Sequence, residues 1–366
     1  MGQSKMHSLA QPDGIIQKQR NFVLVLTFLA AIALISILIA VSLGSAKISA
    51  NEAYRIILYK LFHLNINHIA EQASLAHMDI IWEIRLPRVI MSAVVGAGLA
   101  VCGVVMQAAV QNPLAEPYIL GISAGASLGA TFSILLGGLA GMLFGLGTAV
   151  WAFMGALGAS LFVITLSSIG GRASTVKMVL AGSIASALFI AFTNFIIYIS
   201  SNAEGMRSVT FWTMGSLAAA KWDNLALPIA GVGICCIFFL SQFRTLNTLL
   251  LGEEAAISLG IDLGKVRRLY LIITALVTGL IVAACGIFGF VGLVVPHVVR
   301  GVIGADHRRL LPGTILVGSI FLIWADVLAR TILPSGELPI GILTALVGAP
   351  FFMYILVKQS FNFGGQ

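Results

Sequence analysis

Residues 88–110 read RVIMSAVVGAGLAVCGVVMQAAV, an apolar run interrupted by few polar side chains. About 20 apolar residues suffice for a helix to cross the hydrocarbon core of a bilayer. Similar runs lie at 22–44, 88–110, 118–137, 142–168, 176–200, 226–243, 268–287, 289–304, 311–330 and 338–357. The sequence therefore predicts an all-α polytopic membrane protein with about ten transmembrane helices.

The composition of the whole chain supports this class. Of 366 residues, 59% are hydrophobic and only 10% are charged, against about 25% charged residues in ordinary soluble domains. Too few polar side chains remain to cover a soluble surface, so lipid must cover much of it. The net charge of +7 comes from basic residues between apolar runs, which indicates topology signals and no nucleic-acid partner.

Positive charge also predicts the orientation in the membrane. Residues 1–21 are polar and form a predicted cytoplasmic tail, and the following apolar run is too long for a cleaved signal peptide. Ten spans then place both termini in the cytoplasm. The cytoplasmic loops hold Arg172, Lys177, Arg244, Lys265, Arg267, Arg268, Arg308 and Arg309, as the excess of positive charge inside requires. No linker divides residues 22–360, which we interpret as one transmembrane domain in a plasma membrane.

Glycines mark two features of the predicted spans. Gly286, Gly289 and Gly292 break the pair of runs around 268–304, one of which is short. Gly121, Gly125 and Gly129 recur every four residues on one helical face. Such a stripe lets helix backbones approach closely. Packing within one subunit is the simpler interpretation, and a subunit interface or a pathway lining is the alternative.

The motifs of an ATPase or another enzyme are missing from the sequence. The nearest approach to a phosphate-binding loop is GIDLGKV at 260–266, which is one residue short between its glycines and ends in valine. No HExxH or GxSxG motif occurs. His297 has no second metal ligand at helical spacing, so we expect no metal site and no cofactor. Asp326 is costly in hydrocarbon. We expect it to bond a neighbouring helix or Arg330, with a transport role as the alternative.

The loop at 244–265 reads RTLNTLLLGEEAAISLGIDLGK and is flanked by basic residues. Glu253 and Glu254 stand near the start of a short helical pattern, where acidic groups suit the helix dipole. Apolar residues give this predicted helix, near 251–261, one hydrophobic side. It could rest on lipid, or it could dock against a partner.

Three arginines are expected at the outer ends of predicted spans. Arg85 and Arg88 lie in IRLPRVI at 84–90, and Arg330 ends another span on the same side. They could anchor in lipid headgroups, or they could form a basic face for the carboxylates of a soluble partner. In the preceding segment, His63 and His68 could contact such a partner, although a plain surface loop is the simpler interpretation.

Longer stretches of the chain resemble the FecCD family of ABC importer permeases, which includes cobalamin, haem and ferric-siderophore permeases. The matching stretches are RLPRVIMSAVVGAGLAVCGVVMQAAVQNPLAEPYILGISAGA at 85–126, FWTMGSL at 211–217, LNTLLLGEEAAISLGI at 246–261, GIFGFVGLVVPHVVRGVIGADHRRLLP at 286–312 and ADVLARTILPSGELPIGILTALVGAPFF at 325–352. They occur in order over most of residues 80–360, and the residues before position 80 carry little of the resemblance.

The resemblance implies a cobalamin-permease-like fold and a machine of several chains. Two permease chains would form a dimer, two separate ATPase subunits would dock from the cytoplasm, and an extracytoplasmic binding protein would deliver the cargo. Arg85, Arg88 and Arg330 would receive glutamates of the binding protein. The stretch 251–260 would be the coupling helix that fits the ATPase, with its matching positions Gly252, Glu253, Ala256, Leu259 and Gly260.

The resemblance favours a ferric siderophore as cargo, and leaves cobalamin and haem open. An ion-coupled secondary transporter is the alternative from another class, and it would need ionisable residues at mid-membrane in several spans. Asp326 is the only clear candidate. An intramembrane enzyme would need paired catalytic groups, which the sequence does not offer. We therefore expect a transport subunit that performs no chemistry of its own.

Overall fold

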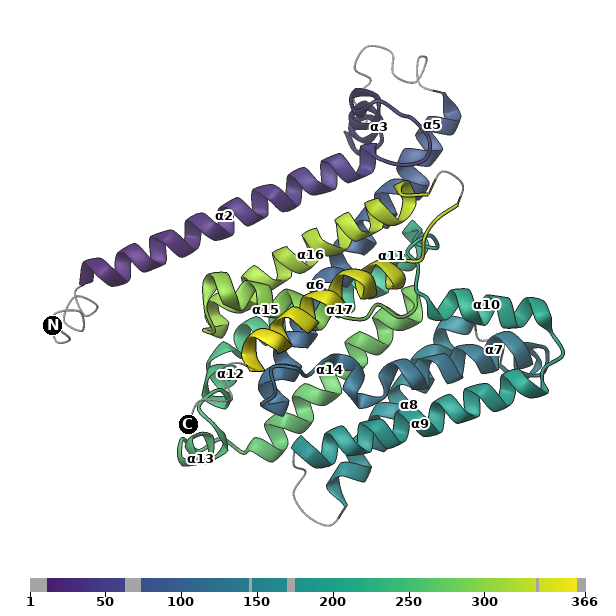
Figure 1. The fold of residues 1–366 in the computed structure, drawn as a ribbon. Coiled ribbons are helices and arrows are strands. Elements are labelled where there is room, and N and C mark those ends of the chain that lie inside the picture. Colours follow the sequence, from purple (N-terminus) through teal and green to yellow (C-terminus); the bar gives the residue numbers. More distant parts are fainter. Residues whose placement is uncertain (1–11, 63–73, 145–146, 170–174, 334–335, 361–366) are drawn as a thin grey trace.

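The structure, a computed structural model, describes residues 12–62, 74–144, 147–169, 175–333 and 336–360, and helices joined by loops make up these ranges (Figure 1). His63 and His68 lie outside the described residues. The helices are α2 (Pro12–Ser42), α3 (Ala50–Phe62), α5 (Leu75–Asp79), the π-helix η1 (Ile80–Arg85), α6 (Leu86–Val110), the 3-10 helix η2 (Pro117–Leu120), α7 (Ile122–Phe144), α8 (Thr148–Ser168), α9 (Thr175–Ile199), α10 (Ala203–Thr213), α11 (Trp222–Ser241), α12 (Phe243–Leu249), α13 (Glu253–Ser258), α14 (Leu263–Cys285), α15 (Val291–Ile303), α16 (His307–Thr331) and α17 (Ile340–Ser360).

The prediction of about ten membrane helices is confirmed. Within the described ranges, seven helices are long and apolar enough to cross a membrane, and three shorter apolar helices lie at 122–137, 291–303 and 340–355. Each of them falls on one of the predicted runs. The first helix, α2, starts at Pro12, so half of the predicted polar tail is helical. Its stretch suited to a membrane begins at Gln19.

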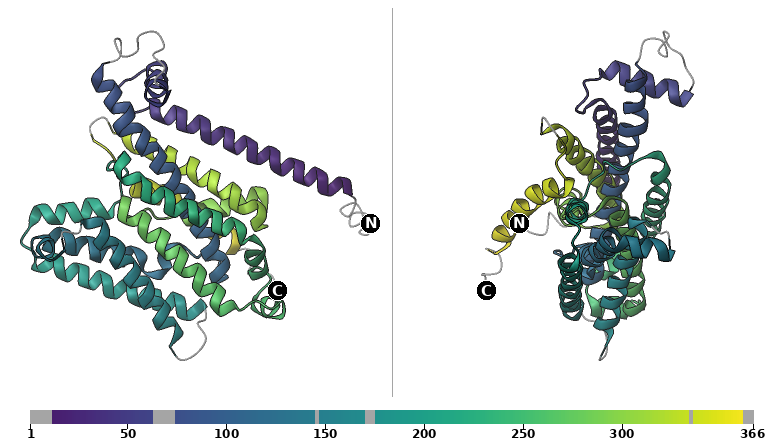
Figure 2. Two further views of the ribbon diagram at one scale, coloured as in Figure 1. Left: turned by 180° about the vertical axis from the view of Figure 1, so that it is seen from behind. Right: turned by 90° about the vertical axis from the view of Figure 1, so that its right-hand side faces the viewer.

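Most of the long helices run side by side, which gives the molecule two distinct ends (Figures 1 and 2). We call them the α3 end, with α3, α5 and α10, and the α13 end, with α12 and α13. Helices α7, α8 and α9 form one side of the molecule, and α2 lies at the opposite edge (Figure 1). Together with α5 and η1, α6 forms one continuous helical stretch of 36 residues from Leu75 to Val110, about 54 Å long.

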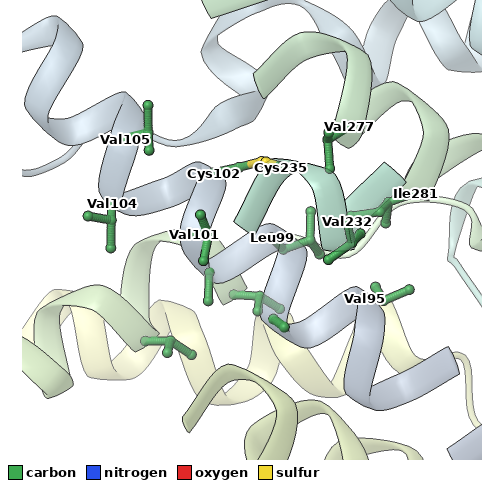
Figure 3. Packing of buried hydrophobic residues seen from close by; sticks show 14 of the residues in the cluster. Val95, Leu99, Val101, Cys102, Val104, Val105, Val232, Cys235, Val277 and Ile281 are labelled. Atoms are coloured by element: carbon green, nitrogen blue, oxygen red, sulfur yellow. The ribbon is translucent and has the colours of Figure 1, made fainter. Parts of the chain in front are cut away.

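Helix α6 is the centre of the hydrophobic core, and 83% of its most apolar window is buried. Figure 3 shows side chains of α6 meeting those of α11 and α14, with the free thiols of Cys102 and Cys235 next to one another. Glycine allows α6 to touch two other helices backbone to backbone. A Cβ on Gly96 would overlap the carbonyl group of Gly318 in α16, and a Cβ on Gly103 would overlap that of Gly292 in α15.

The glycine stripe of α7 packs within the subunit, as its simpler interpretation predicted. Gly125 lies against the backbone of Gly155 in α8, and Gly129 lies against the backbone of Trp151. In each case a Cβ would overlap a carbonyl oxygen of the neighbouring helix. These contacts hold α7 and α8 together as one tightly packed pair.

The glycine-marked break between α14 and α15 is also observed. Helix α14 ends at Cys285, and α15 has only 13 residues, about 20 Å, against a hydrocarbon thickness of about 30 Å. Irregular backbone at membrane depth is tolerated where protein satisfies its polar groups. Here the backbone N–H of Phe290 donates to Glu116 Oε1 at 2.7 Å, and that of Ser216 donates to the carbonyl of Cys285 at 2.8 Å.

Candidate functional site

At the α3 end, the three predicted docking arginines come together with two carboxylates, Asp326 of α16 and Glu337 of the α16–α17 loop. We call these five residues the arginine cluster. Arg85, at the end of η1, donates to the carbonyl oxygens of Val41, Ser42 and Ala46 at 3.2, 2.8 and 2.6 Å. It therefore satisfies carbonyl groups at the C-terminal end of α2, where a cation is favoured by the helix dipole.

Arg88, one turn further along, holds both carboxylates of the cluster. Its Nε donates to Asp326 Oδ1 at 2.7 Å, and its Nη1 lies 2.8 Å from each oxygen of Glu337. Asp326 is fully buried, whereas the side chain of Glu337 is 45% exposed. Charge-assisted hydrogen bonds of this length are the strong class in proteins, so Arg88 joins α6, α16 and the loop before α17.

Arg330 completes the arginine cluster from α16. Its Nη2 donates to the carbonyl oxygen of Ala40 in α2 at 2.8 Å, and its Nε lies 3.3 Å from Asp326 Oδ2. The second contact lacks hydrogen-bond geometry, so it acts as an ion pair only. The expected pairing of Asp326 with Arg330 one turn along is thus confirmed, and Asp326 bonds a neighbouring helix as well.

The arginine cluster corrects the picture of an open basic face. Arg85, Arg88 and Arg330 are only 4%, 4% and 5% exposed, because each guanidinium binds protein carbonyls or carboxylates. They do not point outward as lipid headgroup anchors. Their docking role stays a prediction. Glu337 was not among the predicted site residues, although a carboxylate just beyond a span that ends in arginine was an available signal.

At the α13 end, the predicted coupling stretch forms a short helix between two glycines. Helix α13 spans Glu253–Ser258, inside the predicted range of 251–261. Gly252 and Gly260 have φ values of 96° and 82°, which side chains disfavour. Gly252 lies directly before the helix, and Gly260 lies two residues after its last residue, Ser258. We call residues 250–260 the α13 segment.

One residue of the α13 segment faces the protein and several face away. Ala256 is fully buried, whereas Leu259 is 64% exposed, and Leu250, Leu251 and Ile257 are exposed as well. A cavity of about 800 Å³ separates part of the segment from the ends of α8 and α9 and is lined by Glu253, Ile257 and residues of α14, among others. The segment therefore offers an apolar surface and has open space beside it.

Glu253 connects the α13 segment to the central helix. Its Oε1 lies 2.6 Å from Arg267 Nη2 in α14, and Arg267 Nε donates to the carbonyl oxygen of Ala109 at 2.8 Å. Arg267 is buried. One guanidinium thus connects α13 to the last turn of α6. The sequence marked Arg267 only as a topology signal.

A second set of contacts ties α12 to the start of α16. Asn247 Oδ1 accepts from the backbone N–H of His307 at 2.8 Å, and Asn247 Nδ2 donates to Asp306 Oδ1 at 2.8 Å. Burial raises the pKa of the Asp306 carboxyl, but the hydrogen bonds from Asn247 and from the backbone N–H of Arg308 outweigh it, so its pKa lies below the usual value. The charged carboxylate suits the N-terminal end of α16.

The sequence profile of the FecCD transport family matches residues 32–358, a range that contains both ends just described. The chain belongs to the FecCD transport family. The hemin transport system permease protein HmuU of Yersinia pestis is 39% identical over 328 residues, which are 89% of this chain and 94% of HmuU. The cobalamin import system permease protein BtuC of Halobacterium salinarum is 42% identical over 279 residues, 76% of this chain and 73% of that protein.

A solved structure with a similar fold supports the same conclusion. It is presented as an inward-facing conformation of a metal-chelate type ABC transporter, and it superposes with a TM-score of 0.76 at 31% identity. The match covers 91% of this chain and 99% of that one. This FecCD chain is therefore a multi-pass membrane permease of an ABC transporter, a transport component and not an enzyme. Importer permeases of this kind work with ATPase and substrate-binding partners.

Proposed function

We propose that this FecCD permease imports an iron chelate, most favourably a ferric siderophore, across the bacterial plasma membrane. The observation that carries the proposal is the match over 91% of the chain to a metal-chelate type ABC transporter. Haem is the second candidate, because HmuU is similar over 89% of the chain, and cobalamin is the third, because of the similarity to BtuC.

The proposal places the α13 end in the cytoplasm and the α3 end outside. Basic residues that flank the spans gather at the α13 end, where Arg244, Lys265 and Arg268 lie close in sequence to the α13 segment. Positive charge next to short loops is retained in the cytoplasm. Both termini are then cytoplasmic.

A second copy of the chain is proposed as the partner in the membrane, with the pathway along the interface. Helix α9 supports this. Ser183, Asn194 and Tyr198 lie on one face of α9, carry polar groups and are all exposed. Polar groups are costly against lipid, so water or protein is expected to cover this face. A pathway between two copies supplies both.

Docking is proposed at each end. The arginine cluster receives carboxylates of the extracytoplasmic binding protein, since arginine–carboxylate pairs are strong and directional. The exposed leucines of the α13 segment fit a groove on the ATPase. Gly252 and Gly260 bound the helix and so keep it short enough to enter that groove. Closure of the ATPases then moves α13, and Arg267 passes the movement to α6 as a rigid-body change.

Uptake by whole cells tests the cargo. In a strain that lacks this chain, radiolabelled ferric siderophore uptake is expected to fall to background and to return when the chain is supplied. Labelled haemin and labelled cobalamin, measured in the same cells, serve as the competing cargos. Unchanged siderophore uptake together with lost haemin or cobalamin uptake would replace the siderophore by that cargo.

Glu253→Gln is expected to uncouple the permease from its ATPase. The substitution removes the charge that holds Arg267 at 2.6 Å, so movement of α13 reaches α6 less effectively. We expect about tenfold less transport per ATP hydrolysed, measured in proteoliposomes that contain both subunits. The matched control is Glu254→Gln, which removes the adjacent charge. Equal coupling ratios for the two variants would contradict the role of Glu253.

A further inference from the structure

The two carboxylates that bind Arg88 differ in how easily they can leave. Asp326 is fully buried within α16, whereas Glu337 is 45% exposed and lies in a loop directly after Gly336, whose φ is 103°. We infer that Glu337 is a resident competitor: it occupies Arg88 in the free permease and is displaced when a carboxylate of the binding protein docks. This inference rests on the docking role proposed above for the arginine cluster.

The geometry of Arg88 allows such an exchange. Its Nε is taken by Asp326, and Glu337 binds the terminal Nη1 with both oxygens at 2.8 Å. A partner's carboxylate needs the terminal nitrogens of a guanidinium, which is the part that Glu337 occupies. With Arg88 only 4% exposed, a partner cannot reach it unless Glu337 first moves aside.

The charges of the cluster favour an exchange of one carboxylate for another over the simple loss of Glu337. The arginine cluster contains three arginines and two carboxylates, which leaves one positive charge in excess, and only Arg88 and Arg330 contact the carboxylates. If Glu337 moves into water, Arg88 would remain buried with Asp326 alone, and uncompensated buried charge is costly. An incoming carboxylate restores the balance, while Glu337 gains full hydration. Glu337 therefore keeps the cluster closed until a partner supplies its replacement.

The competition between Glu337 and a partner's carboxylate has an expected size, measured as a change in docking affinity. A resident group that occupies Arg88 reduces the apparent affinity of a partner in proportion to the fraction of time for which Arg88 is free. Partly exposed ion pairs are weak, and removing one corresponds to a factor of roughly two to five. Glu337→Gln is expected to strengthen docking by that factor. It retains the size of the side chain and removes only its charge.

Accessibility of Arg88 tests the inference without any partner. The purified permease is treated with a water-soluble phenylglyoxal, which reacts with the terminal nitrogens of arginine, and adducts are mapped by mass spectrometry. Exposed Arg207 in α10 serves as an internal standard. Glu337→Gln is expected to label Arg88 several times faster than the unmodified chain. The control Glu83→Gln, at another exposed carboxylate of the α3 end, is expected to leave the rate unchanged.

An unchanged labelling rate of Arg88 in Glu337→Gln would overturn the inference. A second measurement, the affinity of the permease for the binding protein that supports uptake, separates a failure of this inference from a failure of the proposed function. If Arg88→Lys, which cannot form a bidentate pair, docks as tightly as the unmodified chain, the docking role of the cluster is wrong. If Arg88→Lys weakens docking but Glu337→Gln leaves it unchanged, the docking role stands and the competition by Glu337 is wrong.

Discussion

Asp326→Asn is expected to lower the free energy of unfolding of the permease by about 3–5 kcal/mol, the usual cost of breaking a buried ion pair from one side. Asp326 is fully buried and is the only carboxylate that contacts both Arg88 and Arg330 in the described chain. Asparagine keeps the shape but not the charge, so two buried guanidinium groups lose their common counter-ion. Unfolding by SDS in mixed micelles measures the change.

The control for this prediction is Glu337→Gln, which removes a charge from the same arginine but at a half-exposed position. Its expected effect on stability is within about 1 kcal/mol. Similar losses for the two variants would mean that burial does not govern the strength of the cluster. A stability of Asp326→Asn equal to that of the unmodified chain would contradict the assigned role of Asp326.

Gly103→Ala is expected to destabilise the permease by about 1–3 kcal/mol, the usual cost of overfilling a packed core. The new methyl group would overlap the carbonyl oxygen of Gly292, and backbone in a helix cannot easily move aside. Helices α6 and α15 would have to separate, which loosens the centre of the molecule. The same SDS unfolding experiment measures the effect.

Gly158→Ala is the matched control, since a Cβ at this position of α8 meets nothing within 4 Å. Alanine is favoured over glycine inside a helix by roughly 0.5–1 kcal/mol, so this variant is expected to be neutral or slightly stabilised. Opposite signs for the two substitutions would establish that close approach, and not the loss of glycine itself, is responsible. Equal effects would refute the packing argument.

The sequence predicted the features that depend on residues close together along the chain. Apolar runs located the ten membrane helices, because span length is set by the bilayer and read directly from composition. The break after Cys285 was visible because Gly286 interrupts the apolar run. Glu253 and Glu254 likewise located the start of α13, whereas the positive φ angles of Gly252 and Gly260, which bound its short length, are seen only in the structure.

The features that the sequence could not predict depend on residues far apart in the chain. Arg88 and Glu337 are separated by 249 positions, and no local pattern relates them. Arg85 binds backbone carbonyls of α2, and such acceptors leave no trace in a side-chain pattern. Helix α3 was missed because its 13 residues are too short and too polar for a membrane span. The three arginines do lie together at one end of the molecule, but their burial was not predicted.

Helix α2 is fastened to the rest of the molecule partly by a helix made much later. Only 11% of its apolar window is buried. Arg85 binds the carbonyl groups of Val41 and Ser42 at its C-terminal end. Two further contacts come from α16, in which Arg330 binds Ala40 and the indole of Trp324 donates to Ser36 at 3.1 Å. During synthesis, α2 must therefore wait until α16 has been made before it acquires these two contacts. A ribosome that stalls before residue 324 would leave α2 without its contacts to α16, held only by contacts near its C-terminal end.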